Sequence, residues 1–413
     1  MKMNRSTESL FLEAISAGIR GERVRWAPLP PEQWTSLFQL AETQKLLPIL
    51  TDAVFECPNA ETDLRFSAYR SAAKRQVQLQ ALKDAAFLPI YMRLRDAGIP
   101  ALVVKGTLCR SVYPNGALRI SSDEDLLVEQ ARFPDACRLL AEAGLIAASE
   151  EDPLLTAEIA WRSADGLCYI ELHKYLFAPN SGPFGLLQTV FSEVFEHTRE
   201  YRLCDGGSVL SLSPHDHLLY LLLHAMKHFI RTGFGLRQIC DIGLWAERWQ
   251  EEINWELLWE QAEQVHGAQF CAALFQIAEK SLGIPLELPA PWSSIAPDPL
   301  PMLRDLLDGG IYGSSSKSRE HSARITQDAV AAQRTGKRRS LRTALFPSAK
   351  SLERDFPVLK EHPLVLPLIW EKRLVRYLKS SASNPSDQPA ETLRLGKERL
   401  SLLREYGILD EKP

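Results

Sequence analysis

Several features that would place this 413-residue chain in a specialised class are missing. Its seven cysteines are an odd number and none forms a Cys-x-x-Cys pair, which argues against a disulfide framework or a zinc knuckle. We expect reduced, buried thiols and a cytoplasmic location. No repeat of fixed period is evident, so the sequence does not predict a solenoid.

Long hydrophobic runs and a strong charge of one sign are missing too. No apolar stretch reaches about eighteen residues, so no membrane span is expected. The first five residues are not followed by the apolar core of a secretion signal. The net charge of −4 and the pI near 6.2 argue against general nucleic-acid binding.

Two carboxylates, Asp123 and Asp125, stand one residue apart at the start of the apolar run 126–128. In a strand, residues i and i+2 point to the same face, so this pair can share divalent cations while Glu124 faces the other way. Acidic residues also gather in turns, where Asp bonds its own backbone. The pair therefore predicts a metal site only together with its surroundings.

An apolar run, 99–104, precedes the pair and ends in Lys105, Gly106 and Thr107. It predicts a buried strand followed by a glycine turn. Glycine lets the backbone approach a phosphate closely, and the amides that open a helix attract anions. Lys105 and Arg119 are candidates for phosphate contacts, and solvated surface charge is the alternative.

A third acidic candidate, Glu171, lies in a predicted strand over 167–175. Alternation places Tyr169, Glu171 and His173 on one face. If this strand lies beside the one that carries Asp125, Glu171 completes a site of three carboxylates. The alternative is an exposed Glu on an edge strand.

Helical patterns surround these predicted strands. Apolar spacing predicts helices within the first ninety-five residues, and Pro89 should kink or break the last of them, 68–96. Short helices are expected over 107–113 and 133–143. A second helical region runs from Pro214 to Gly283, with Ser213 as its N-cap. The expected division is 1–95 helical, 96–205 catalytic core, 206–285 helical, and 286–413 linker, basic segment and C-terminal helices.

Three histidines, His217, His224 and His228, share one face of the first helix in that second region. Without a Glu between them, we expect buried or substrate-facing roles and not zinc ligation. Arg237 and Asp241 are four residues apart, so they can form a helix-surface salt bridge, although a structural role stays open. Four tryptophans are expected to pack in the core. They are Trp245, Trp249, Trp255 and Trp259.

The character of the chain changes beyond Gly283. The proline-rich segment 285–301 predicts a linker, and 309–318 a flexible Gly/Ser stretch. Basic residues then accumulate over 317–354, as a solvated face or a site for an anionic acceptor. They include Arg334, Lys337, Arg338, Arg339 and Arg342. Helices are expected over 363–378 and up to Tyr406.

Taken together, these residues resemble the bacterial nucleotidyltransferase family of the DNA polymerase beta-like superfamily. The resemblance covers about two thirds of the chain and includes residues 221–228 and 236–242. Glu124 stands where the superfamily prefers an apolar residue, and Glu171 where it usually has Asp. The residues that carry the resemblance are Lys105, Gly106, Tyr113, Arg119, Asp123, Asp125, Glu171 and His173.

The resemblance implies an α+β fold, in which a small mixed sheet is flanked by helical N- and C-terminal regions. It also implies Mg²⁺, or Mn²⁺ in its place, held by Asp123, Asp125 and Glu171, which act as the catalytic residues. The implied partners are a nucleoside triphosphate and a small-molecule or peptide acceptor. The implied nucleotide-binding residues are Lys105, Gly106, Thr107, Arg119, Ser122, His224 and His228.

Two other functions remain open at this point. An Asp-x-Asp that holds a metal diphosphate also serves glycosyl transfer from a nucleotide sugar. A non-catalytic binding module is the third possibility, favoured if Glu124 prevents the metal site from forming.

Overall fold

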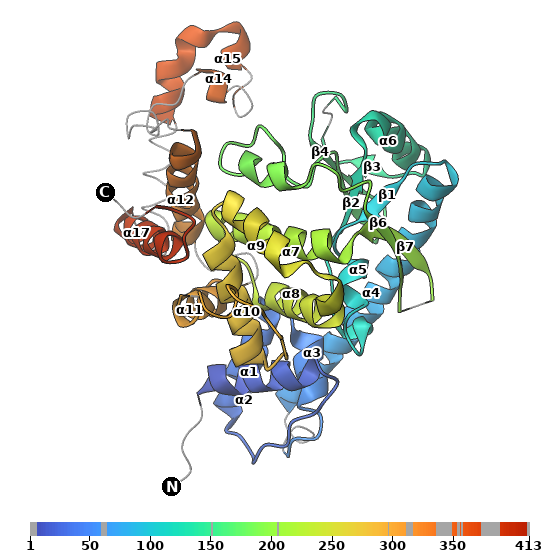
Figure 1. The fold of residues 1–413 in the computed structure, drawn as a ribbon, viewed down its shortest axis with the longest axis vertical. Coiled ribbons are helices and arrows are strands. Elements are labelled where there is room, and N and C mark those ends of the chain that lie inside the picture. Colours follow the sequence, from blue (N-terminus) through green and yellow to red (C-terminus); the bar gives the residue numbers. More distant parts are fainter. Residues whose placement is uncertain are drawn as a thin grey trace.

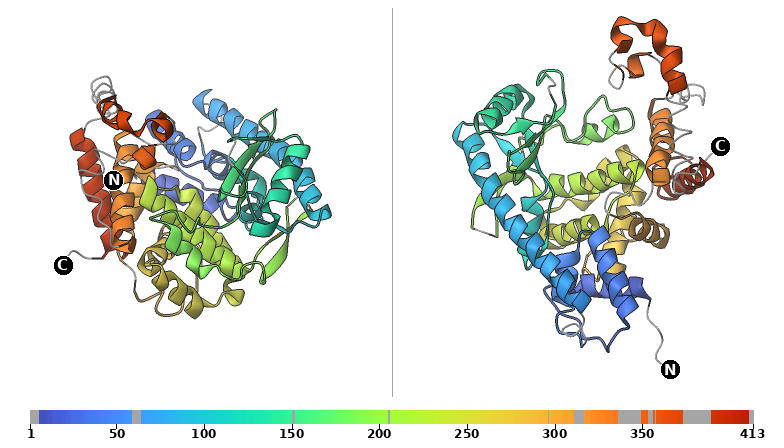
Figure 2. Two further views of the ribbon diagram at one scale, coloured as in Figure 1. Left: turned by 90° about the horizontal axis from the view of Figure 1, so that it is seen from above. Right: turned by 180° about the vertical axis from the view of Figure 1, so that it is seen from behind.

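A computed structural model describes the chain at 6–58, 64–149, 152–204, 206–295, 297–310, 317–335, 349–352, 356, 358–372 and 389–410. Its N-terminal part is helical, as expected. The four helices are α1 (Thr7–Gly18), α2 (Pro31–Thr43), α3 (Leu47–Ala53) and α4 (Leu64–Asp96). The first three pack together, and α4 runs from them to the sheet (Figures 1 and 2).

The sequence predicts a kink or a break at Pro89, and helix α4 continues through this residue without a break. Proline removes one backbone hydrogen bond from a helix interior, which costs about 3 kcal/mol or more. Phe87, Tyr91 and Leu94 flank this position and are buried in the core. Their burial offsets the lost hydrogen bond and keeps the helix in place.

Five of the strands between α4 and α7 form a mixed sheet with the order β1-β2-β5-β4-β3. Only β2 and β5 pair in parallel; the other neighbours are antiparallel. The fold is therefore α+β, as predicted. The strands are β1 (Ala101–Val103), β2 (Glu124–Val128), β3 (Ile146–Ala147), β4 (Glu158–Arg162) and β5 (Tyr169–His173).

Short elements connect these strands. Helix α5 (Thr107–Arg110) is shorter than the expected 107–113, and α6 (Phe133–Glu142) ends near Gly144, whose φ of 86° suits glycine. A separate ribbon of β6 (Thr198–Arg202) and β7 (Ser208–Leu212) packs β7 beside β1. The 3-10 turns of this part are η1 (Gly116–Leu118), η2 (Gln130–Arg132) and η3 (Gly185–Val190).

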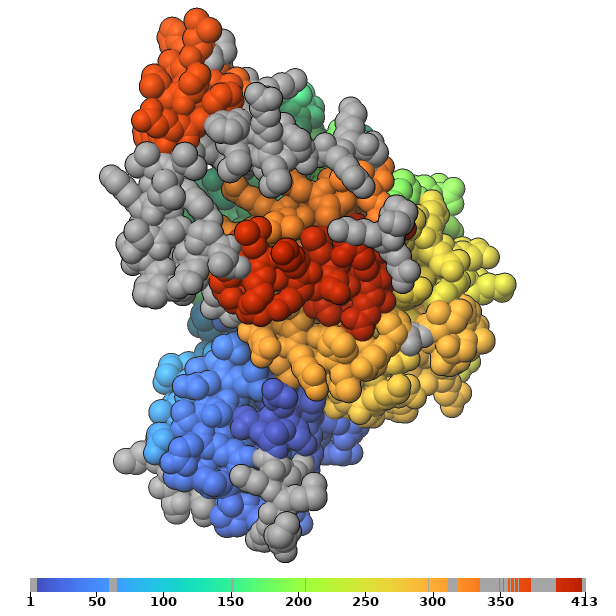
Figure 3. Space-filling view, turned by 90° about the vertical axis from the view of Figure 1, so that its left-hand side faces the viewer, coloured from blue at the N-terminus to red at the C-terminus, as the bar shows by residue number. Residues whose placement is uncertain are grey.

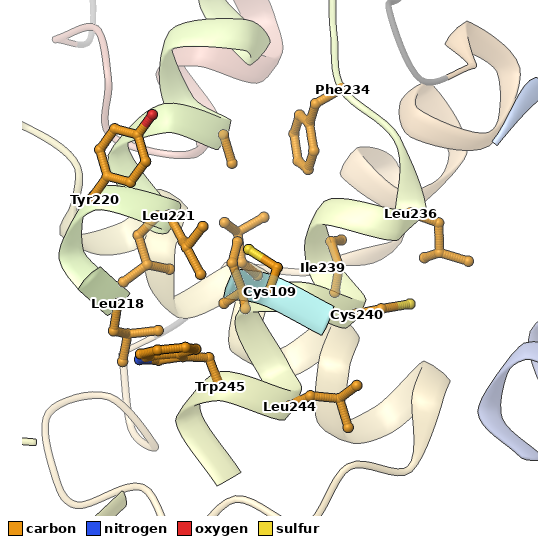
Figure 4. Packing of buried hydrophobic residues seen from close by; sticks show 14 of the residues in the cluster. Cys109, Leu218, Tyr220, Leu221, Phe234, Leu236, Ile239, Cys240, Leu244 and Trp245 are labelled. Atoms are coloured by element: carbon orange, nitrogen blue, oxygen red, sulfur yellow. The ribbon is translucent and has the colours of Figure 1, made fainter. Parts of the chain in front are cut away.

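The second helical region forms as expected. It contains α7 (Pro214–Arg231), α8 (Leu236–Trp249), η4 (Gln250–Glu252), α9 (Trp255–Gln264) and α10 (Ala268–Leu282). Ser213 caps α7, because its side chain accepts a hydrogen bond from the Asp216 N–H. Trp245 is fully buried and the other three tryptophans pack against the same core. Figure 4 shows Trp245 near Leu218 of α7 in this core.

The C-terminal part adds helices to this core. Helix α12 (Lys317–Thr335) packs against both α7 and α17 (Pro389–Glu405), and Figure 3 shows α12 in orange beside α17 in red. The segment 285–301 is no loose linker, because Trp292 is buried and donates a hydrogen bond to the Trp255 carbonyl. The remaining elements are α11 (Leu300–Gly309), α14 (Ala349–Leu352), α15 (Val358–Glu361) and η5 (Pro363–Val365).

Three predictions fall partly outside the described residues. One is the helix expected over 363–378, because residues 373–378 are not among them. Of the Gly/Ser stretch, residues 311–316 lie outside them, and so do Lys337, Arg338, Arg339 and Arg342 of the basic segment. Among the helices that are described, none combines the length and the apolar character that a membrane crossing requires.

Candidate active site

The register of the two parallel strands creates the centre of the site. Asp125 of β2 lies directly opposite Glu171 of β5. Residues opposite each other in a ladder share one face, so both carboxylates project from the same side of the sheet. The expected condition, that the strand of Glu171 lies beside that of Asp125, is confirmed. The same pairing directs Glu124 to the opposite face, as expected.

His173 joins the two carboxylates from the next position on this face. Its Nε2 lies 3.2 Å from Asp125 Oδ1 and 3.8 Å from Glu171 Oε2. Its Nδ1 lies 3.2 Å from Oε2 of Glu158, the first residue of β4. Asp125, Glu171 and His173 have ligand atoms within 4.8 Å of one another, and we call them the Asp-Glu-His cluster.

The charges in this cluster are strongly coupled. Burial acts to raise the pKa of Asp125, but the Lys105 charge and the His173 hydrogen bond hold it well below its usual range. Burial and the neighbouring Asp125 charge raise the pKa of Glu171 to about 7. Burial alone would lower the pKa of His173, yet hydrogen bonds to Asp125 and Glu158 raise it to about 9. In this state a proton on His173 balances part of the carboxylate charge.

One oxygen of the cluster has no hydrogen-bond donor. Asp125 Oδ2 is buried and accepts no hydrogen bond from any residue that the structure describes. The Lys105 ammonium lies 3.7 Å from it. A buried carboxylate oxygen without a donor is costly, and a bound cation would satisfy it. This atom therefore suits a metal ligand.

Asp123 lies just before β2 and is half-buried, outside the Asp-Glu-His cluster. Its charge still contributes to raising the pKa values of Lys105 and Glu171, so it is close to both. Ser122 beside it is exposed. The structure thus brings Asp125 and Glu171 together and leaves Asp123 at the rim.

The glycine turn after β1 is held from beneath by Glu124. Gly106 has a φ of 64°, and a Cβ built on it would lie 2.1 Å from Glu124 Oε2. The same oxygen accepts a hydrogen bond of 2.7 Å from the Thr107 N–H. That amide, expected to face a phosphate, is therefore occupied. Glu124 fixes the turn, which explains why a carboxylate is tolerated between the two aspartates.

Arg119, between η1 and β2, holds the same turn and links it to Asp241 of α8. Its Nη1 donates to the Gly106 carbonyl at 3.0 Å, while Nη2 and Nε donate to the two Asp241 oxygens at 2.6 and 3.1 Å. The Tyr113 hydroxyl donates to Asp241 Oδ1 at 2.7 Å. Arg119 is only 1% exposed, so it is no surface charge and its donors are engaged within the protein.

This network also settles the role of the α8 pair. Asp241 is buried and pairs with Arg119, and Arg237 is buried and donates to the Ile120 carbonyl. The helix-surface salt bridge between Arg237 and Asp241 is therefore wrong, and the structural alternative holds. Both side chains point from α8 toward the segment between β1 and β2, which ties the helical region to the sheet.

The histidines of α7 divide between two environments. His217 is fully buried, and its Nε2–H donates to the Val104 carbonyl at 2.9 Å, next to the glycine turn. His224 and His228 contact each other, with their Nε2 atoms 3.3 Å apart. Burial and the nearby Lys105 charge lower the pKa values of both, that of His228 to about 3. Both imidazoles are therefore neutral at neutral pH in this structure.

Two residues of this site, His173 and Glu158, were not predicted as a metal ligand or as a partner of one. His173 shares the face of Glu171, so alternation already contained the signal. Glu158 could not be found in this way, because its position follows from β4 pairing with β5, which only the folded sheet reveals.

The sheet therefore carries paired carboxylates beside a glycine turn, and the helices α7 and α8 cover it. In a comparison with known families, the sequence model of a family described as uncharacterised nucleotidyltransferase matches residues 30–283. This is more than half of the chain, and the chain belongs to this family. Searches of curated proteins and of solved structures gave no match.

Proposed function

We propose that the protein transfers a nucleoside monophosphate from a nucleoside triphosphate to a hydroxyl or phosphate of a small molecule or peptide, in the manner of the DNA polymerase beta-like superfamily. The observation that carries this proposal is the opposition of Asp125 and Glu171, with Asp125 Oδ2 lacking a donor, beside the Gly106 turn. The family match supports the reaction class.

The proposed metal ligands are Asp125 and Glu171, with Asp123 at the rim and His173 as a further donor. Carboxylate oxygens suit Mg²⁺ and Mn²⁺, whereas an imidazole nitrogen adds affinity for transition metals such as Mn²⁺. A divalent cation bound there would neutralise negative charge on the triphosphate and on the leaving pyrophosphate. The pair of Asp125 and His173 must lose its shared proton before His173 can serve as a ligand.

The protein's own residues then have distinct tasks. Lys105 lies 3.7 Å from Asp125 and is the cation best placed to contact a phosphate. Gly106 and Thr107 line the turn, which Glu124 and Arg119 hold rigid. Under this proposal Arg119 is a positioning residue, and Ser122, His224 and His228 lie around the nucleotide.

Glu171 is also the proposed proton acceptor, because its carboxylate lies opposite Asp125 at the proposed site of transfer. The acceptor oxygen forms a bond to the α-phosphorus as the bond from that phosphorus to the oxygen bridging the β-phosphorus breaks. The electron pair leaves with pyrophosphate, and the acceptor proton passes to Glu171. Atoms and charge balance without a further reactant.

The test is to incubate the protein with Mg²⁺ or Mn²⁺, a panel of nucleoside triphosphates and nucleotide sugars, and hydroxyl-bearing acceptors. We expect pyrophosphate release that is lost in Asp125→Asn and kept in Asp135→Asn, a surface variant on α6. Release of a nucleoside diphosphate from a nucleotide sugar would instead support glycosyl transfer. Equal turnover in Asp125→Asn and the wild type would reject the proposed site.

A further inference from the structure

A cavity of about 610 Å³ lies beside the Asp-Glu-His cluster, and it has no part in the reaction as proposed so far. Its lining residues come mainly from β4, the segment 176–184, α7 and α12. Part of its wall is apolar, including Leu176, Phe177 and Phe184, all buried. Such a volume is that of a site for a small organic molecule.

Two cations of α7 line this cavity, one turn apart. They are Lys227 and Arg231. Within the described ranges of the chain, neither the Lys227 ammonium nor the Arg231 guanidinium forms an ion pair or donates a hydrogen bond. Lys227 is half-buried and Arg231 is exposed, so the cost of desolvation without a partner falls mainly on the Lys227 ammonium. Two such cations on one wall favour an anionic ligand.

A further polar atom on this wall lacks a partner. Ser181 Oγ is buried and makes no hydrogen bond with the residues that the structure describes. Hydroxyls in buried positions are usually hydrogen-bonded. A ligand that carries oxygen atoms would satisfy this hydroxyl together with the two cations.

The cavity is joined to the Asp-Glu-His cluster by Glu158. This residue lines the cavity and also contacts His173 Nδ1 at 3.2 Å. Across the sheet the order is the glycine turn after β1, then Asp125 on β2, then Glu171 and His173 on β5, then Glu158 on β4. The cluster therefore separates the glycine turn from the cavity, as a transfer site must separate donor phosphates from acceptor.

One wall of the cavity comes from outside the region that matches the family, 30–283. Gln327 of α12 lines it, and Arg334 of the same helix bonds the Pro183 carbonyl and so fixes the segment 176–184. Arg334 also donates to the Val265 carbonyl at 3.3 Å. The C-terminal helices thus shape this cavity in a way that the shared family region does not.

We propose that this cavity binds the acceptor substrate, a small molecule with an apolar body and a carboxylate or phosphate that pairs with Lys227 and Arg231. The inference rests on the proposed nucleotidyl transfer and names the acceptor class for it. Gln327 and the segment fixed by Arg334 then contribute to acceptor specificity. The nucleotide occupies the opposite side of the cluster, beside Gly106.

Two fluorescent probes that share the same aromatic rings and differ in charge test the acceptor site directly on the full chain. One is 8-anilinonaphthalene-1-sulfonate, which carries an anionic group, and the other is N-phenyl-1-naphthylamine, which is uncharged. We expect the sulfonate to bind about ten-fold more tightly, because charged hydrogen bonds to Lys227 and Arg231 favour it. Lys227→Gln and Arg231→Gln should remove this preference, and Lys227→Arg should retain it.

Matched variants guard against misfolding and binding elsewhere. Lys280→Gln removes an exposed cation on α10 and should leave the preference unchanged. Ala148→Trp fills the cavity from its exposed rim and should weaken both probes. An unchanged sulfonate preference in both α7 variants, or unchanged binding of both probes in Ala148→Trp, would overturn the proposal.

Competition between the sulfonate and a nucleotide tests whether the anion site of the cavity belongs to the acceptor or to the nucleotide. With Mg²⁺ and α,β-methylene-ATP added, we expect the sulfonate to stay bound, because the nucleotide occupies the other side of the cluster. Displacement by this nucleotide would show that the cavity is part of the nucleotide site and would overturn the acceptor assignment. Asp125→Asn should still bind the sulfonate, so failure of the transfer reaction is distinguishable from failure of the cavity assignment.

Discussion

The two flanks of the Asp-Glu-His cluster differ in how their polar side chains are paired. The glycine-turn flank is formed by Lys105 to Thr107 with Arg119, Glu124 and Asp241. Close hydrogen bonds pair the last three of these residues. On the cavity flank, formed by Glu158, Ser181, Lys227 and Arg231, the cations and the hydroxyl have no partner among the described residues.

This difference separates structural from ligand-binding polar groups. A buried ion pair that is fully hydrogen-bonded fixes geometry, and removing one partner leaves an uncompensated charge. A polar group without a protein partner is free to form hydrogen bonds to a ligand, and a buried one gains most from doing so. The comparison predicts that substitutions on the first flank affect stability and those on the second affect binding.

The largest effect is expected at the cluster itself. Asp125→Asn removes a proposed metal ligand and should reduce nucleotidyl transfer by on the order of 10³-fold, because charge stabilisation of the transferring group is lost. Turnover is measured as pyrophosphate release at saturating nucleotide. Asp135→Asn serves as the control, and a decrease of less than about ten-fold in Asp125→Asn would place the reaction elsewhere.

The next largest effect is expected on the glycine-turn flank. Arg119→Met leaves the buried Asp241 carboxylate without its partner and should lower the free energy of unfolding by about 3–5 kcal/mol. Urea unfolding followed by circular dichroism measures this loss. The double variant Arg119→Met/Asp241→Leu should recover a large part of it, since no lone charge remains. A double variant as unstable as the single one would show that the charge pairing is not the cause.

A smaller loss is expected at the turn. Gly106→Ala meets both a φ of 64° and a clash with Glu124, so it should destabilise by about 2–3 kcal/mol. Gly98→Ala is the matched control, because Gly98 has a φ of 66° with nothing within 4 Å of its added Cβ. That control should lose only about 1 kcal/mol. If Gly106→Ala and Gly98→Ala lost equal stability in thermal unfolding, Glu124 would not be a support of the turn.

The pH dependence of stability tests His217, which contacts the Val104 carbonyl next to the glycine turn. Burial lowers the pKa of His217 to about 3, below the usual value of 6.5. The unfolded chain therefore binds a proton that the folded protein excludes, and stability falls as the pH drops from 6.5 toward 3. In His217→Gln the slope of unfolding free energy against pH, between pH 4 and 6, should decrease by about 1.4 kcal/mol per pH unit. A slope equal to that of the wild type would mean that His217 is charged in the fold.

The smallest effect is expected on the cavity flank. Arg231→Gln removes a cation without a partner among the described residues, and Arg231 is exposed. The free energy of unfolding should change by no more than about 0.5 kcal/mol, in contrast to Arg119→Met. The same urea titration measures both. A loss as large as that of Arg119→Met would mean that the two flanks do not differ.

Local patterns predicted much of the site. Alternation along a strand placed Asp125 and Glu171 correctly and turned Glu124 to the other face, because side-chain direction in a strand follows from sequence alone. Spacing also predicted the N-cap at Ser213. These features depend on neighbouring residues only.

Long-range pairing could not be predicted in the same way. Arg119 and Asp241 are 122 residues apart, and no local pattern links them. The expected pair of Arg237 with Asp241 had the correct helical spacing, but tertiary packing turned both side chains inward. Glu158 and the cavity likewise depend on how β4, α7 and α12 come together. The continuity of α4 through Pro89 is a further case in which packing outweighs a local preference.

The most direct test of the account is cation binding at the Asp-Glu-His cluster. Mn²⁺ titration followed by electron paramagnetic resonance, with a non-hydrolysable nucleoside triphosphate present, reports the bound ion without requiring an acceptor. We predict binding to the wild type and to Asp135→Asn, and its loss in Asp125→Asn. Equal Mn²⁺ affinity in Asp125→Asn and the wild type would contradict the account.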